Sequence, residues 1–166
     1  MRVSRSRKRW SVAAVGVVVV GTVAAVALAS APSNFTTTVL ATGNLDNSVQ
    51  VNTDRIKFQT KDPTVVRVQK IVIGPGGSSG WRHRPGIVIV TVASGAVTVW
   101  ESDCSTTTYG PGQPAGSVFI ESGDDPGQVT SVDGATTYAT LVVPNSNPPV
   151  FRIDDTPPPC AADATA

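Results

Sequence analysis

The sequence has few of the side chains that build metal and nucleophilic sites. It contains one histidine, two cysteines and one methionine in 166 residues, and only 15% of its residues are charged. One histidine cannot supply the several imidazoles that most transition-metal sites use. Neither cysteine has a second cysteine or a histidine at zinc-site spacing. Ser117 and Ser131 lack a histidine at a recognisable triad spacing. The familiar zinc and serine-triad signatures are therefore absent.

Leucine, methionine and glutamate are scarce, whereas valine, threonine and isoleucine recur throughout the chain. Fifteen glycines and thirteen prolines supply residues for tight turns. This balance favours strands over helices. Apolar residues make up 40% of the chain, enough for one core at a length typical of one domain. The composition predicts a single all-β domain.

The net charge of +1 hides an asymmetry along the chain. The first thirty residues carry five basic residues and no acidic one, which leaves 8 basic and 12 acidic residues in the remainder, a net charge of −4. An acidic domain lacks the excess of basic side chains that binds the phosphate backbone of nucleic acids. We therefore expect no nucleic-acid partner.

Residues 1–31 have the pattern of an export segment, with a basic start followed by an uncharged stretch that ends in small residues. Ala27-Leu28-Ala29 fits signal cleavage before Ser30. The alternative is a retained membrane anchor, because the 21 uncharged residues from Ser11 to Ala31 can cross about 30 Å of hydrocarbon. Both alternatives predict an extracytoplasmic domain, secreted or anchored to the membrane, that contacts the membrane only through this segment.

The two cysteines, Cys104 and Cys160, follow the export segment. An oxidising compartment favours a disulfide between them, and the alternative is two unpaired thiols. The disulfide would tether the C-terminal tail, residues 155–166, and contribute about 4 kcal/mol in the chain-entropy model.

Turn signals divide the rest of the chain into short strands. Residues 32–48 are predicted to form a linker and a first strand near 37–41, and residues 49–154 a β-barrel domain. We expect the run at 87–92, IVIVTV, to be covered on both faces, and the run at 55–60 to be half-buried. The remaining strands are expected at 64–73, 96–102, 117–122, 128–132, 136–144 and 150–154. About nine short strands predict a sandwich or barrel.

One stretch carries a family resemblance. PGGSSGWRHRPGIVIVTVASGAVTVWE, followed by YGPGQ and FIESGDDPGQVTSVDG, resembles the small exported single-domain cupins of actinobacteria. The resemblance covers roughly residues 50–145 and implies a cupin-like jelly roll, a double-stranded β-helix barrel.

The resemblance also implies where a metal would be bound. With Gly95 as the closing glycine of the first cupin motif, the glutamate position is Val88 and the two histidine positions are Arg84 and Arg82. His83 occupies the spacer. In the second motif the histidine position falls near Gln128, with a one-residue shift left open. Arginine is permanently protonated and has no lone pair to donate, so we expect no metal and no other cofactor.

Three orientations of this motif are open. Arg82 and Arg84 can face the barrel interior, paired with Glu101, Glu121, Asp124 or an anionic ligand. A slip of one residue would instead turn His83 inward. The arginines can also lie in solvent at a barrel mouth and pack on Trp81, which is the default expectation.

These residues give three functional hypotheses. The first is a non-metal module that binds a small molecule, with an anion as one candidate ligand, or that is structural, and its candidate site residues are Trp81, Arg82, His83, Arg84, Glu121 and Gln128. The second is a cupin enzyme with an unorthodox site around Arg82, His83, Glu121 and Gln128. The third is a homodimeric interaction module. We assign no catalytic residue and lean against an enzyme.

Overall fold

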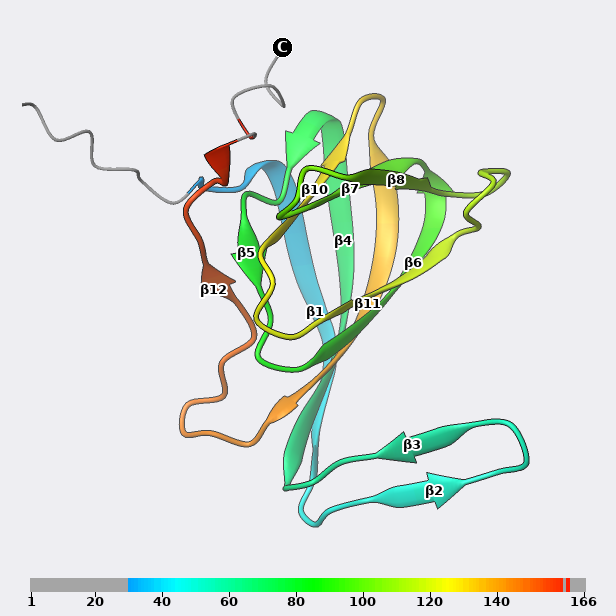
Figure 1. The fold of residues 1–166 in the computed structure, drawn as a ribbon, viewed down its shortest axis with the longest axis vertical. Coiled ribbons are helices and arrows are strands. Elements are labelled where there is room, and N and C mark those ends of the chain that lie inside the picture. The colour runs from blue at the N-terminus through cyan, green and yellow to red at the C-terminus, as the bar shows by residue number, and fades with distance from the viewer. Residues whose placement is uncertain (1–29, 160, 162–166) are drawn as a thin grey trace, which may run out of the picture.

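The structure, a computed structural model, describes residues 30–159 and 161 of the chain. This part of the chain is all-β, as predicted (Figure 1). Its strands are β1 (Ser33–Leu45), β2 (Gln50–Asn52), β3 (Lys57–Gln59), β4 (Thr64–Ser78), β5 (Arg82–His83), β6 (Ile87–Gly95), β7 (Val97–Glu101), β8 (Thr106–Tyr109), β9 (Val118–Ser122), β10 (Gly127–Ser131), β11 (Ala135–Pro144) and β12 (Ile153–Asp154).

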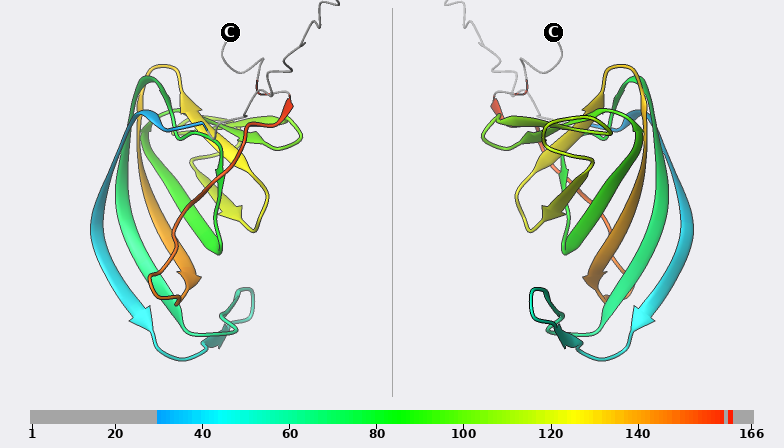
Figure 2. Two further views of the ribbon diagram at one scale, coloured as in Figure 1. Left: turned by 90° about the vertical axis from the view of Figure 1, so that its left-hand side faces the viewer. Right: turned by 90° about the vertical axis from the view of Figure 1, so that its right-hand side faces the viewer.

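Ten of these strands form one antiparallel sheet that curls into a nearly closed barrel. Hydrogen-bonded neighbours run in the order β12-β5-β10-β4-β11-β6-β9, with β1 beside β4 and β7 between β10 and β8. Figure 2 shows the long strands on one side and the short strands β5, β10 and β12 on the other. The short strands therefore form the wall that faces the long ones across the core.

Strand alternation in β4 decides which residues form the core. Val65, Ile71 and Ile73 are buried, whereas Val72 between them is exposed. Each side chain of a strand faces opposite to its neighbours, so the odd positions of this strand point into the barrel. Leu141 and Val143 of β11 complete the same inner layer with no exposed surface.

The prediction for residues 87–92 was wrong. Strand β6 alternates strictly, with Val88, Val90 and Val92 buried and Ile87 and Ile89 exposed. An apolar run therefore marks a one-sided strand here, because the outer face of the sheet is uncovered in the described part of the chain. Periodicity cannot separate the two cases when both faces are apolar.

Two further strand predictions need correction. The run at 55–60 contributes only β3, which pairs with β2 in an exposed hairpin set apart from the barrel in Figure 1, so it is not half-buried. The first strand is longer than residues 37–41, because β1 pairs with β4 along most of its length.

Several predictions fall outside the described residues. The export segment lies in residues 1–29 except for its last two residues, and the predicted disulfide requires Cys160. No helix within residues 30–159 is both long and apolar enough to span a membrane.

Candidate functional site

The motif at residues 81–84 places its two arginines inside the barrel. Strand β5 turns Arg82 inward and His83 outward, and Arg84 returns to the inner side. Arg82 is 5% exposed and Arg84 9%. The default expectation of solvated arginines is therefore wrong, and so is the slipped register. Of the three orientations, the structure has the inward arginines with an acidic partner.

Glu121 is the acidic partner of both arginines. Its carboxylate accepts a hydrogen bond from Nη2 of Arg82, and its Oε2 lies 3.5 Å from Nε of Arg84. Backbone carbonyls supply the other acceptors: Nη1 of Arg82 donates to Gly127 O at 2.7 Å, and Nη1 of Arg84 to Phe151 O at 2.6 Å. The two guanidinium groups thus share one carboxylate, and each also donates a hydrogen bond to one backbone carbonyl.

This arrangement leaves positive charge only partly compensated. Burial, and then the charge of Arg82, lower the pKa of Arg84 to about 10, while Glu121 raises it. Arg84 remains protonated at neutral pH. The Nε atoms of both arginines are buried and make no hydrogen bond. A buried cation without full pairing is costly, so these groups favour an additional acceptor.

The arginines border a cavity of about 240 Å³. Tyr109 and Phe119 form its aromatic side, with their ring centroids 5.0 Å apart. A second cavity of about 20 Å³ lies among the core residues and shares Arg82, Arg84 and Glu121 with the first. The charged cluster therefore separates the outer cavity from the apolar interior of the barrel.

Two more carboxylates line the outer cavity near solvent. Glu101 follows Val99 on the inner face of β7, and Asp125 lies in the turn before β10. Burial, followed by the charges of Glu121, Asp103 and Asp125, raises the pKa of Glu101. Asp124, considered from the sequence as a partner of the arginines, is exposed and lines neither cavity.

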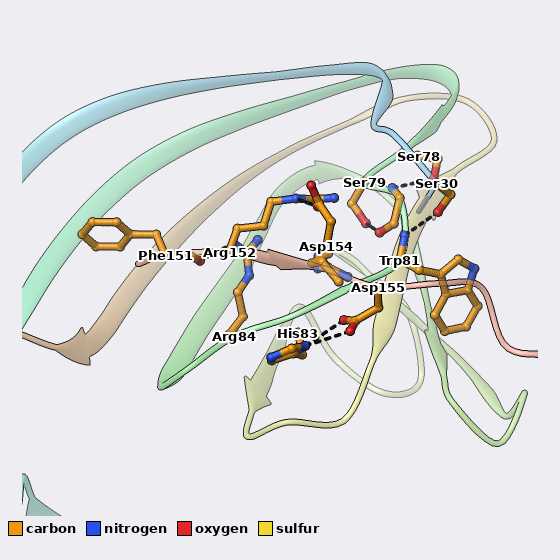
Figure 3. A network of polar contacts seen from close by, with 12 residues as sticks. Ser30, Ser78, Ser79, Trp81, His83, Arg84, Phe151, Arg152, Asp154 and Asp155 are labelled. Atoms are coloured by element: carbon orange, nitrogen blue, oxygen red, sulfur yellow. Dashed lines mark hydrogen bonds and ion pairs between the residues drawn. The ribbon is translucent and has the colours of Figure 1, made fainter. Parts of the chain in front are cut away.

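His83 contacts the C-terminal segment as well as the outer cavity. Its Nδ1 lies 2.8 Å from Oδ2 of Asp155, and the pair is visible in Figure 3. Strand β12 pairs with β5 at the same place, opposite His83 and Arg82. Phe151, just before β12, lies under the guanidinium of Arg67 at 3.4 Å. The segment 151–155 thus closes the barrel beside the arginines.

Two predicted site residues do not line either cavity. Trp81 is 2% exposed, and its backbone N–H donates to Oγ of Ser30 at 2.7 Å (Figure 3). Gln128 faces away from the cavities, and its amide donates to Oγ of Ser78.

The inner face of the second half comes instead from Phe119 and Glu121 on β9, which follows the turn at 111–116. The histidine position of the second motif therefore does not fall at Gln128 itself, whereas Val129, within the one-residue shift left open, is buried and lines the inner cavity. The alternation of FIE in residues 119–121 was the signal for these inward positions.

The residues at the metal positions that the resemblance implies do not fit a transition metal. The positions implied for ligands hold Arg82, Arg84 and Val88, and none of these side chains donates a lone pair. Within the described residues, no group of three or more histidine, cysteine or acidic side chains could hold a metal ion. Glu121 is already engaged by both arginines. The guanidinium groups of the cluster offer N–H donors, which pair with anions and not with cations.

No known family profile matches the sequence, and no curated protein matches it. Solved structures do match. A cupin-2 domain protein from Rhodospirillum rubrum is 14% identical over 82% of this chain and 78% of its own, with a TM-score of 0.53. A cupin superfamily protein from Desulfitobacterium hafniense is 10% identical over 70% of this chain and 84% of its own, with a TM-score of 0.46.

A salicylate 1,2-dioxygenase from Pseudoaminobacter salicylatoxidans is 17% identical over 45% of this chain, with a TM-score of 0.40, and the chain spans only 19% of that enzyme. Of these three matches, the one to the R. rubrum protein covers most of both chains and has a TM-score above 0.5, and it supports an argument about the fold. The strand order and this match confirm the fold that the resemblance implied. The chain has the cupin jelly-roll fold.

Proposed function

We propose that the domain binds a small carboxylate-bearing ligand in the outer cavity, without a metal ion. The observation that carries the proposal is the sharing of Glu121 by Arg82 and Arg84, both of which are buried beside a cavity of about 240 Å³. A ligand carboxylate there completes the charge balance and supplies an acceptor for guanidinium N–H groups.

The geometry supports a positioned rather than a diffuse anion site. Arg82 is fixed by Gly127 O and Glu121, and Arg84 by Phe151 O, so neither guanidinium loses much side-chain freedom on binding. The cavity volume suits a ligand of a few carbon atoms. As a binding protein the domain acts outside the cytoplasm, a proposal that rests on the sequence of residues 1–31 alone.

Thermal unfolding of the purified protein with acetate, propionate, butyrate and inorganic phosphate tests this proposal. A ligand present at ten times its Kd stabilises the folded state by about 1.4 kcal/mol, which raises Tm by several degrees. We expect the increase with at least one carboxylate, and we expect Arg84→Gln to abolish it.

Arg55→Gln is the matched control, because Arg55 is exposed in the β2–β3 hairpin and lines neither cavity. It should leave the ligand-induced increase unchanged. No increase with any carboxylate, or an equal increase in Arg84→Gln, would refute the proposal.

A further inference from the structure

The outer cavity is lined by side chains of both charges. Its cations, Arg82 and Arg84, are buried and also border the inner cavity. Glu101 and Asp125 line the same cavity but are exposed. A ligand that reaches the arginines therefore lies beside these two carboxylates.

The two carboxylates near solvent have no cation of their own. Within residues 30–159, no lysine, arginine or histidine nitrogen forms an ion pair with Glu101 or Asp125. Burial is the largest cause of the raised pKa of Glu101, followed by the charges of Glu121, Asp103 and Asp125, while the more weakly acting charge of Arg82 lowers it. Glu101 and Asp125 thus repel each other, and a cation bound in the cavity would relieve that repulsion.

A simple anion does not match this distribution of charge. Its carboxylate gains from Arg82 and Arg84, but it is repelled by Glu101 and Asp125, which line the same cavity. The domain without its first thirty residues also has a net charge of −4, which disfavours the approach of any anion. A ligand that also carries a cationic group gains from the two carboxylates as well as from the two arginines.

We infer that the ligand is a small zwitterion, with a carboxylate that binds Arg82 and Arg84 and a cationic amine that lies against Glu101 and Asp125. This inference rests on the proposed function and names the class of ligand. The aromatic side of the cavity agrees with it, because Tyr109 and Phe119 offer π-faces that attract an ammonium group.

Isothermal titration of the purified protein with matched pairs of ligands tests the inference. The pairs are acetate with glycine, propionate with 3-aminopropionate, butyrate with 4-aminobutyrate, and pentanoate with 5-aminopentanoate. Each pair differs chiefly by the terminal ammonium group. We expect the amino acid of at least one pair to bind about fivefold more tightly than its carboxylate, the upper end for an exposed ion pair.

The double variant Glu101→Gln/Asp125→Asn should bring the affinity ratio of that pair close to one, while affinity for the simple carboxylate stays equal or rises. Both side chains are exposed, so the substitutions leave the fold intact. Asp124→Asn is the matched control, because Asp124 lies next to Asp125 but lines neither cavity. It should preserve the ratio.

The inference is overturned if the simple carboxylate binds at least as tightly in every pair, or if the double variant keeps the full ratio. In either case carboxylate binding itself stands, provided that Arg84→Gln abolishes it. If no ligand of either kind binds, or if binding survives in Arg84→Gln, the proposed function falls and takes the inference with it.

Discussion

Val88 of β6 lies directly opposite Glu121 of β9 in the antiparallel register of the two strands. Val88 is the position at which the cupin resemblance implies a carboxylate ligand, and Glu121 supplies a carboxylate from the neighbouring strand instead. Opposed residues of an antiparallel pair share a face, so both side chains point into the barrel. The carboxylate of Glu121 forms ion pairs with both Arg82 and Arg84.

The shared carboxylate predicts unequal costs for removing members of the cluster. Glu121→Gln leaves two buried guanidinium groups without a counter-ion and should lower the free energy of unfolding by about 3 kcal/mol. Arg84→Met keeps the Arg82–Glu121 pair, removes a competing cation and has similar volume, so it should change stability by no more than about 1 kcal/mol. Denaturant unfolding measures both, and an Arg84→Met cost equal to that of Glu121→Gln would contradict this account.

Gly95, which ends β6, should not tolerate a side chain. Its φ is +74°, and a Cβ there would collide with the carbonyl oxygen of Gly134. Gly112 has a similar φ of +84° but open space around it, so it is the matched control. We expect Gly112→Ala to cost about 1 kcal/mol from the backbone conformation alone. Gly95→Ala should cost about 3 kcal/mol or more, because overpacking adds to that cost. Equal costs in denaturant unfolding would show that the close approach has no energetic effect.

Glu101 should make stability depend on pH with a definite sign. Because its pKa is raised, the folded state binds its proton more tightly than the unfolded state, and this contribution to stability is lost as pH rises through the raised pKa. Glu101→Gln should therefore be more stable than wild type at pH 7, by about 0.5 kcal/mol after solvent screening. The difference should vanish below the ordinary value of 4.5.

Asp103 is a control for this pH experiment, because its pKa is shifted in the opposite direction to that of Glu101. Hydrogen bonds from Ser105 lower its pKa, so its charged form favours folding. Asp103→Asn should be less stable than wild type at pH 7, with the difference disappearing in acid. Thermal unfolding across pH 3 to 7 follows both variants, and the same sign in both would rule out this electrostatic explanation.

The contact between His83 and Asp155 should hold the C-terminal segment to the barrel. Strand β12 pairs with β5 only at Ile153 and Asp154, and the backbone N–H of Asp155 donates to Trp81 O, so the side-chain contact with His83 adds to a short attachment. Asp155→Asn should lower local stability by about 1 kcal/mol and speed hydrogen exchange of these amides about fivefold. Asp154→Asn, whose carboxylate pairs with the partly exposed Arg152, should change the exchange rate less. Similar effects of the two variants would contradict the proposed attachment.

The all-β class and most strand positions follow from the sequence, because the preference of valine and threonine for strands and of glycine for turns depends only on nearby residues. Val65, Ile71 and Ile73 read as one face of a strand from alternation alone, and they are buried on that face. Ile87 and Ile89 were predicted to be buried but are exposed. An apolar residue in the sequence does not show whether its face of the strand is covered. That distinction depends on whether another layer covers the sheet.

The site was predictable only in part. The order of Gly80, Trp81, Pro85, Gly86 and Gly95 indicated the cupin motif, and the spacing put Arg82, Arg84 and Val88 at its inner positions. Gln128 was misplaced because a shift of one residue in a strand exchanges its two faces, and the Pro/Gly turns before β9 and before β10 look alike in sequence.

The sequence by itself determined the fold class and the identity of the residues at the implied metal positions, because these depend on local pattern and spacing. It also determined that arginine cannot bind a metal ion there, which is a property of the side chain alone. Only the tertiary structure decided that both arginines point inward, that Glu121 neutralises them, and that Glu101 and Asp125 line the same cavity. Those relationships join residues far apart in the chain, and the closure of the sheet into a barrel brings them together.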